Sequence, residues 1–422
     1  MQARPPVALY VHVPFCLSLC PYCDFVVYSG RAARGPASRI DAFVEALLVE
    51  LELRPDGIEA RFGAARPALA SVYLGGGTPS LLSAAVIGRL LERVDRRFGI
   101  ASGAEVTIEA NPGPADRGDL AGFRAAGVNR LSLGVQSLDP AELKRLGRRH
   151  DAIDVSEAMA AARAAGFDDV SLDLLYDIPD QTPASWAATL DGVLALEPDH
   201  VSAYALTLDD PDAESLTGLT GDHLPVRAGA RSWRGRARRE QDEDRAAELY
   251  AIARTRLAAA GYGGYELSNW ARPGHECRHN LTYWQREPYE AVGPGAHAFD
   301  GALERRWNAA RLDAYLAALL PRDGSRASLP PGGNETLDEP TARAESAILG
   351  LRLAVGVDET LLGDPLLGPG LDWAIGVALV ERVVGRLRLS ESGRLLSNEV
   401  FSRLLPDARS SAAAAVTTQE AA

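Results

Sequence analysis

The sequence has 422 residues, 46% of them hydrophobic and 24% charged, a composition typical of a soluble globular protein with enough material for more than one domain. Its formal net charge of −13 argues against a nucleic-acid-binding protein, because phosphate contacts need an excess of Lys and Arg. No apolar run approaches the roughly 20 residues of a membrane span, and residues 1–6 lack the apolar stretch of a secretory signal, so we expect a cytoplasmic protein without a transmembrane segment.

The first half of the chain alternates short apolar runs, which predict strands, with longer segments whose apolar residues recur at helical spacing. The expected strands are residues 8–14, 71–74, 105–110, 130–135, 170–178 and 200–208. The expected helices are residues 39–53, 84–98, 116–126, 153–165, 183–196 and 242–260. Six strand–helix units predict a parallel sheet, and periodicity leaves both an open sheet and a partial barrel as alternatives. In either case, ligands are expected at the carboxyl ends of the strands.

Two later segments break this alternation. Residues 218–239 are rich in Gly and hold six arginines from Arg227 onward, with no acidic residue among them before Glu240. We predict a solvated insertion loop there, and a functional basic patch is the alternative. Residues 327–339 are rich in Pro and Gly and predict a linker.

The chain after this linker predicts a small helical domain. Residues 340–353 and 370–386 are expected to form helices, and residues 387–389 and 395–396 are expected to pair as a hairpin. The tail from Ser410 is small and polar, so we expect it to be disordered.

Three of the four cysteines, Cys16, Cys20 and Cys23, lie in one loop directly after the first expected strand. Disulfide frameworks are typical of small secreted domains, so clustered thiols in a large intracellular chain favour a metal site. Closely spaced thiolates are typical ligands of an iron–sulfur cluster, and three of them leave one iron of a cubane for another ligand. Zinc with His12 as a fourth ligand is the alternative, although the CxxxCxxC spacing differs from the paired CxxC of structural zinc.

A second loop, with Gly75, Gly76 and Gly77 before Thr78, follows the second expected strand. Consecutive glycines allow close backbone approach, and their free backbone groups can bind a charged small molecule. A tight strand–helix turn is the alternative explanation.

The cysteine loop after a first strand, with Tyr22 before the last Cys and a Gly-rich loop one unit later, resembles the radical S-adenosylmethionine (SAM) superfamily. The resemblance implies a [4Fe–4S] cluster whose open iron binds SAM. Five sequence blocks narrow it: YVHVPFC at 10–16, GGGTP at 75–79, IEANP at 108–112, RLSLGVQS at 130–137 and DLLYDIPDQT at 173–182. Together they resemble the oxygen-independent coproporphyrinogen III oxidase family, with its HemW heme chaperone branch, from about residue 8 to about residue 400.

This resemblance implies roles for individual residues. Tyr10 would bind SAM near the cluster, and Gly77 and Thr78 would contact its methionine part. Further SAM-binding residues would come from successive units: Glu109, Gln136, Arg148, Asp173 and Thr207. From the residues alone, the two carboxylates could instead cap helices, and Arg148 could form a surface ion pair with Asp151.

Two features favour the heme chaperone branch over the oxidase. Phe25 stands where the oxidase has a further Cys, two residues after the third cluster ligand. Only seven residues precede Ala8, whereas the oxidase has a longer N-terminal segment that covers its active site.

Residues 279–284 read HNLTYW and match the HNxxYW motif that is associated with heme binding in the HemW branch. Imidazole is a common axial ligand of heme iron, and aromatic side chains pack on porphyrins. His279, Tyr283 and Trp284 are therefore the expected heme-binding residues, with a polar interdomain contact as the alternative for His279. The GPGAH sequence at 293–297 resembles the Gly-rich turn that follows in this family. His275, Cys277 and His279 alternate along the chain, which on a strand would form another metal-site pattern.

Two departures from the family pattern stand out. The family usually has Gly where this chain has Asp177, and a side chain there is expected to narrow the pocket beside Asp173. The arginine-rich stretch is also unlike the family.

We therefore expect an α/β fold, a partial (β/α)6 radical SAM barrel with a small C-terminal helical, winged-helix-like domain. The expected parts are a barrel core at 1–230, a barrel-closing segment with the HNxxYW motif at 231–330, the small domain at 331–409 and a disordered tail at 410–422. The expected function is a heme chaperone that binds heme, a [4Fe–4S] cluster and SAM and transfers heme to an acceptor such as a respiratory hemoprotein. A flavodoxin or ferredoxin would donate electrons if SAM is cleaved. The alternative is oxygen-independent coproporphyrinogen III oxidase, in which a radical from SAM removes hydrogen from propionate side chains before decarboxylation.

Overall fold

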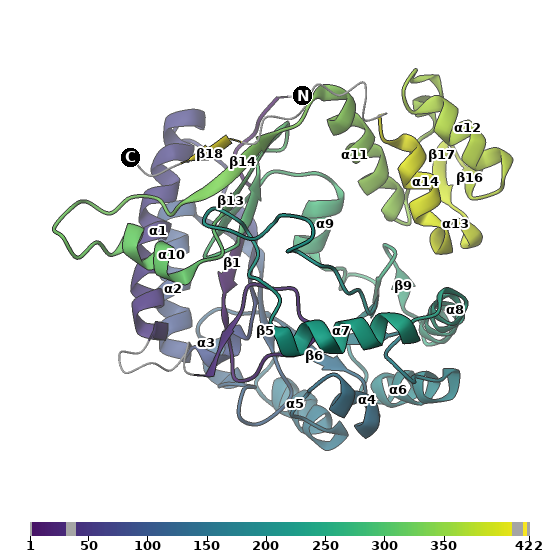
Figure 1. Ribbon diagram of the computed structural model, residues 1–422, viewed down its shortest axis with the longest axis horizontal. Coiled ribbons are helices and arrows are strands. Elements are labelled where there is room, and N and C mark those ends of the chain that lie inside the picture. Colours follow the sequence, from purple (N-terminus) through teal and green to yellow (C-terminus); the bar gives the residue numbers. More distant parts are fainter. Residues whose placement is uncertain (1, 31–38, 407–416, 420–422) are drawn as a thin grey trace.

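The main feature of the computed structural model, which describes residues 2–30, 39–406 and 417–419, is one large sheet (Figure 1). Its 13 strands lie side by side in the order β18 (Thr417–Gln419), β14 (Gly332–Thr336), β13 (Glu304–Asn308), β12 (His297–Phe299), β11 (Tyr289–Val292), β1 (Ala8–Val13), β4 (Leu69–Gly76), β5 (Ile100–Ala110), β6 (Arg130–Gln136), β7 (Val170–Tyr176), β8 (His200–Ala205), β10 (Asn269–Ala271) and β9 (Gly263–Gly264). The strands from β11 to β8 pair in parallel, and those outside them pair antiparallel. Within the described residues the two edges do not pair with each other, so the barrel is partial, as predicted.

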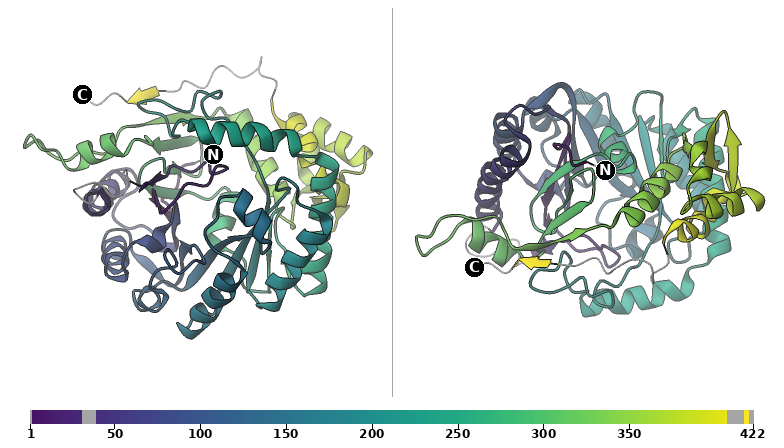
Figure 2. Two further views of the ribbon diagram at one scale, coloured as in Figure 1. Left: turned by 60° about the horizontal axis from the view of Figure 1, so that its bottom comes forward. Right: turned by 90° about the horizontal axis from the view of Figure 1, so that it is seen from above.

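Helices cover the outer face of this sheet, as the strand–helix alternation predicts (Figure 2). They are α1 (Arg39–Phe62), α2 (Ala84–Phe98), α3 (Leu120–Ala125), α4 (Pro140–Arg145), α5 (Ala152–Ala164), α6 (Pro183–Ala195), α8 (Glu243–Ala259) and α10 (Leu312–Leu319). The six predicted strands and six predicted helices are all confirmed with shifted ends. Side-chain caps fix several helix starts: Asp151 and Asp154 form a capping box on α5, and Thr182 and Ser185 form one on α6. No described helix is long and apolar enough to cross a bilayer.

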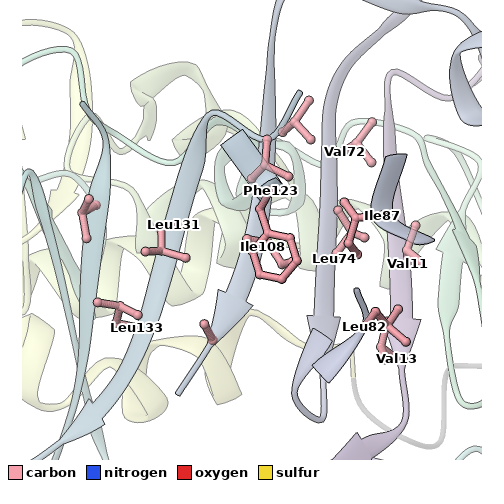
Figure 3. Packing of buried hydrophobic residues seen from close by; sticks show 14 of the residues in the cluster. Val11, Val13, Val72, Leu74, Leu82, Ile87, Ile108, Phe123, Leu131 and Leu133 are labelled. Atoms are coloured by element: carbon pink, nitrogen blue, oxygen red, sulfur yellow. The ribbon is translucent and has the colours of Figure 1, made fainter. Parts of the chain in front are cut away.

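Alternation along the strands divides apolar from polar side chains. Figure 3 shows the apolar set packed between the sheet and the helices: Val11, Val13, Val72, Leu74, Ile108, Leu131 and Leu133 from strands, with Leu82, Ile87 and Phe123. The residues between them point to the opposite face, because successive side chains of a strand alternate. That inner face carries the polar side chains described below.

The arginine-rich stretch is not the solvated loop that the sequence predicts. Helix α7 (Ala228–Glu240) forms over its second half and crosses the open side of the curved sheet (Figures 1 and 2). Ala237 is buried near Leu206 and Leu208, and the Arg234 side chain is also buried. The prediction was wrong because it treated every arginine as solvent-facing, whereas this one turns inward to a set of carbonyl groups.

A smaller unit at the C-terminus has its own core, which includes Leu351, Leu371, Leu387 and Leu404. It consists of a sheet in the order β15 (Val357–Asp358), β17 (Arg386–Leu389) and β16 (Val380–Val383) with α11 (Glu339–Arg352), η3 (Glu359–Gly363), α12 (Gly368–Gly376), α13 (Glu391–Leu395) and α14 (Ser397–Leu404). The helix predicted at 340–353 is therefore confirmed. The division of the chain at residues 230, 330 and 409 stays a prediction.

Several predictions for this region are wrong in detail. The helix predicted at 370–386 ends at Gly376, and the chain returns as β16, which pairs with β17. Residues 395–396 form no hairpin strand, because Ser390 caps a helix there. The predicted linker contains β14, which pairs with β13, and β18 in the expected tail pairs with β14. The rest of the tail predicted from Ser410 lies outside the described residues.

Candidate cluster and cofactor site

Strand β1 delivers the cysteine loop to the carboxyl edge of the sheet. β2 (Phe15–Cys16) pairs with β3 (Tyr28–Ser29), which closes the loop that holds the other two cysteines. Cys16, Cys20 and Cys23 are free thiols, and all three line one cavity of about 660 Å³. Burial raises the pKa of the Cys16 thiol to about 11 and also raises the pKa of the Cys23 thiol. Metal ligation by these sulfurs therefore releases protons.

The Gly-rich loop lies against the cysteine loop. The Gly77 N–H donates to Val13 O (2.8 Å) and the Thr78 N–H to Phe15 O (2.7 Å). A Cβ on Gly77 would lie 2.6 Å from Phe15 O, so only glycine permits this approach. Thr78 then donates its hydroxyl to Cys16 Sγ (3.4 Å), and η2 (Pro79–Leu81) follows. The loop therefore contacts the cysteine loop and is also a turn.

The inner face of the sheet brings carboxylates into the same cavity. Glu109 accepts hydrogen bonds from the Tyr73 hydroxyl (2.9 Å) and the Gly76 N–H (3.0 Å). Burial raises the pKa of Glu109 to about 7. Neither this residue nor Asp173 caps a helix, so the alternative explanation from the sequence is wrong.

Asp173 lies two strands away, with three serines around it. It accepts the hydroxyls of Ser132 (2.6 Å) and Ser171 (2.9 Å), and burial raises the pKa of its carboxyl group. Ser202 also hydrogen bonds to it. These hydroxyls hold the carboxylate in place at the cavity wall.

Arg148 places a positive charge beside the cysteine loop. It donates to Gly134 O (2.5 Å) and to the Asn111 amide oxygen, and its Nη1 lies 3.7 Å from Cys20 Sγ. The predicted alternative, a surface pair with Asp151, is wrong, because the side chain points inward while Asp151 caps α5.

All but one of the residues predicted from the sequence line this cavity. Besides the three cysteines, they are Tyr10, Gly77, Thr78, Glu109, Gln136, Arg148, Asp173, Thr207, His279 and Tyr283. Trp284 is the exception, and it lines a neighbouring cavity. Sequence reasoning missed further polar wall residues: Thr107, Asn111, Arg130, Ser132, Ser171, His200, Ser202 and Tyr204. The sequence pattern that could have predicted them is the alternation of polar residues with Val, Leu and Ile along these strands.

The HNxxYW motif forms α9 (Arg278–Trp284), a short helix whose first residues are tied to Glu105. His279 is buried, with Nδ1 bonded to Ser71 Oγ (2.9 Å) and Nε2 bonded to the Tyr283 hydroxyl (2.9 Å). Burial lowers the pKa of His279 to about 3, so the ring is neutral. The Arg352 guanidinium lies over the Trp284 ring, with its Cζ 4.4 Å from the ring centre.

The other metal patterns suggested by the sequence do not form. His12 lies outside the cysteine cavity: its Nε2–H donates to Val26 O (2.8 Å), and its Nδ1 accepts from the Tyr10 hydroxyl (3.0 Å). Cys277 begins α9 rather than a strand, and among the described residues it does not converge with His275 and His279 on a common centre.

Asp177 does not narrow the cavity, contrary to the prediction. It has a φ of 57°, a left-handed conformation that favours the glycine usual in the family. Its carboxylate turns away to α8, where it accepts from Arg245 Nε (3.0 Å) and Nη2. The residue is therefore part of the contact between the sheet and α8.

Arg234 of α7 holds the cysteine loop from the other side. Its guanidinium donates to Pro21 O (3.0 Å), Tyr22 O (3.1 Å) and Cys23 O (2.9 Å), and it pairs with the Asp24 carboxylate. This residue carries no signal in the sequence that separates it from the other five arginines of the stretch.

The cavity fits a [4Fe–4S] cluster and a small zwitterion such as SAM. Three sulfurs on one loop provide the ligand number that leaves one iron of a cubane open. Thr107 Oγ1 and Arg148 Nε are buried without a hydrogen-bond partner among the described residues. With Glu109 and Asp173, they offer partners for the carboxylate, ammonium and hydroxyl groups of such a ligand.

Comparison with known proteins identifies the family. A sequence model of the radical SAM superfamily matches residues 10–192. "Heme chaperone HemW" of Mycobacterium tuberculosis (strain ATCC 25618 / H37Rv) is 36% identical over 400 residues, which cover 95% of this chain and 95% of that protein. The chain belongs to the HemW family. "Heme chaperone HemW" of Escherichia coli (strain K12) is 31% identical over 414 residues, which cover 96% of this chain and 100% of that protein.

A solved structure agrees with this fold. Coproporphyrinogen III oxidase (HemN) from Escherichia coli superposes with a TM-score of 0.74 at 22% identity, over 95% of this chain and 90% of that chain. This HemW family chain therefore has the radical SAM fold, and its cysteine loop follows β1.

Proposed function

We propose that this protein is a heme chaperone that holds a [4Fe–4S] cluster, binds SAM beside it and passes heme to an acceptor hemoprotein. The observation that carries the proposal is the convergence of Cys16, Cys20 and Cys23 with a polar sheet face in one cavity. Relatives that share over nine-tenths of their length with this chain are named heme chaperones.

The chain's own residues divide the work in this cavity. The three cysteines would hold the cluster, and Tyr10, Gly77 and Thr78 would border the SAM methionine group. Glu109 would accept the ammonium or ribose hydroxyls, and Arg148 would face the carboxylate, because charge-assisted hydrogen bonds are the strongest ones available there. Further wall contacts would come from Gln136, Asp173 and Thr207. The bound cluster would supply electrons for SAM cleavage if the chaperone cycle uses it.

The cluster assignment is tested by single Cys→Ser variants at positions 16, 20 and 23 after anaerobic reconstitution. Each variant should lose most of the iron, the inorganic sulfide and the brown absorption. Cys277→Ser is the matched control, because Cys277 is a buried thiol on α9 outside the loop, and serine also caps helices. Retention of a full cluster in all three loop variants would reject the assignment.

The chaperone function is tested with the reconstituted wild-type protein. Heme should bind saturably and move to an apo-hemoprotein acceptor, and coproporphyrinogen III with SAM and reductant should yield no decarboxylated product. Decarboxylation would instead establish the oxidase. Absence of saturable heme binding would reject the chaperone proposal.

A further inference from the structure

A second cavity, of about 440 Å³, adjoins the cluster cavity. The two share Tyr10, Asp24, Phe25 and Tyr283 in their walls. The other walls of the second cavity come from His12 of β1, from Val26, from α9, from strands β11 to β13, from α11 and from the loop before α7. A ligand held there would lie next to the cysteine loop without occupying the SAM site.

The lining of this second cavity suits a flat aromatic ligand that carries carboxylates. Aromatic walls are provided by Tyr283, Tyr289 and Phe299, with Phe25 exposed at the edge. Two cationic residues, Arg286 and Arg305, also line it, and both pair with Glu345. Carboxylates of a ligand would join this ion-pair network, since one guanidinium group can donate hydrogen bonds to more than one carboxylate.

The loop before α7 places an imidazole in the same cavity. His223 Nδ1 hydrogen bonds to Asp222 Oδ1 (2.9 Å), and the other carboxylate oxygen bonds to His297 Nε2 (2.8 Å). Among the described residues, His223 Nε2 has no hydrogen-bond partner. A carboxylate that holds one nitrogen of a histidine fixes the tautomer and leaves the other nitrogen as a stronger ligand for a metal.

This loop is anchored rather than free. The Trp307 indole donates to Thr220 O (3.1 Å), and the Ala310 N–H donates to Gly221 O (2.8 Å). The His223 N–H donates to Leu216 O (3.2 Å). The histidine is thus held at the cavity by its own backbone contact and by those of the residues just before it.

His279 lacks these properties. It is 1% exposed, and both of its ring nitrogens are already bonded, one to Ser71 and the other to Tyr283. Ligation of iron would require breaking one of these buried hydrogen bonds, which leaves a polar group unsatisfied. In this structure the motif histidine orders α9 and the aromatic wall.

We propose that heme binds in the second cavity and that His223 Nε2 ligates its iron, while Asp222 positions the ring and His279 is structural. The inference rests on the proposed heme chaperone function and assigns the site within it. Heme there would border the cluster cavity at Tyr10 and Tyr283, so that SAM and heme occupy neighbouring sites.

The test is a ferric heme titration of the cluster-loaded protein, followed by Soret absorption and by electron paramagnetic resonance. The His223→Gly variant should bind heme more weakly and should lose the spectrum of an imidazole-ligated iron. Added free imidazole should restore that spectrum in the variant. Asp222→Asn should weaken affinity by about 10-fold or more, as expected when the partner of a metal-bound histidine is lost. His275→Ala is the matched control, since His275 is a half-exposed histidine that lines neither cavity.

His279→Gln should keep the wild-type heme spectrum, because glutamine can replace its hydrogen bonds without ligating iron strongly. The inference is overturned if His223→Gly titrates like wild type, or if a folded His279→Gln variant loses the imidazole spectrum while His223→Gly keeps it. Failure of the wild-type protein to bind heme saturably would overturn the chaperone proposal itself and this inference with it.

Discussion

Replacing Arg234 by alanine removes one buried cation from the back of the cysteine loop. The guanidinium donates to three consecutive loop carbonyls, pairs with Asp24, and also donates to Asp209 O (2.6 Å). The Arg234 side chain is 5% exposed and the Asp24 side chain 31% exposed. Loss of the cation therefore leaves several acceptors that water can reach only in part.

The size of the effect follows from this burial. Removing one partner of a buried pair costs about 3–5 kcal/mol. We take the lower end, about 3 kcal/mol, since water reaches the Asp24 carboxylate. The loss acts mainly on local opening of the loop, because α7 contributes little else to the main core. At about 1.4 kcal/mol per tenfold, amide exchange in residues 17–24 should be about 100-fold faster.

The assay is hydrogen exchange followed by mass spectrometry on the cluster-free protein, with release of cluster iron to a chelator as a second readout. Arg236→Ala is the control, because Arg236 is an exposed arginine on the same helix with no hydrogen bond or ion pair in the described structure. Equal exchange of the cysteine loop in the two variants would refute the view that Arg234 holds this loop.

Two further predictions concern titration and backbone conformation. Burial lowers the pKa of His150 to about 4, so the unfolded chain takes up the proton first, and stability is lost as pH falls from about 6.5 to about 4. Between about pH 7.5 and about pH 5.5, the His150→Gln variant should therefore lose about 1.3 kcal/mol less unfolding free energy than the wild type. Other titrating groups such as Glu109 contribute equally to both proteins. Chemical denaturation that gives both proteins the same pH dependence of unfolding free energy would contradict this. Asp177→Ala should be less stable than Asp177→Gly by about 1 kcal/mol, because both lose Arg245 but only glycine is relaxed at positive φ. Equal melting of the two variants, or weakened SAM binding in either, would count against the assigned position of Asp177.

Local pattern was sufficient for much of the fold and of the cluster site. A run of alternating residues such as Leu9, Val11 and Val13 buries one face wherever the strand lies, so the strands could be predicted before the sheet order was known. Helix starts followed from nearby side chains, as at Asp151. Cys16, Cys20 and Cys23 are close in the chain, so their convergence needs no long-range contact.

Contacts between distant residues decided the rest. Arg234 and Arg236 lie two residues apart and have similar neighbours in the sequence. Only Arg234 is buried, because α7 packs over the cysteine loop on that side. The HNxxYW motif predicts His279 as the heme ligand, but both ring nitrogens of His279 are hydrogen-bonded in the structure. His223 has one ring nitrogen without a partner among the described residues, and it lies at an aromatic cavity. Hydrogen-bond saturation depends on which atoms meet across the fold, and spacing along the chain carries no record of it. The sequence by itself determined the grouping of three cysteines in one loop and the strand–helix units, whereas only the tertiary structure decided which polar side chains are free to bind.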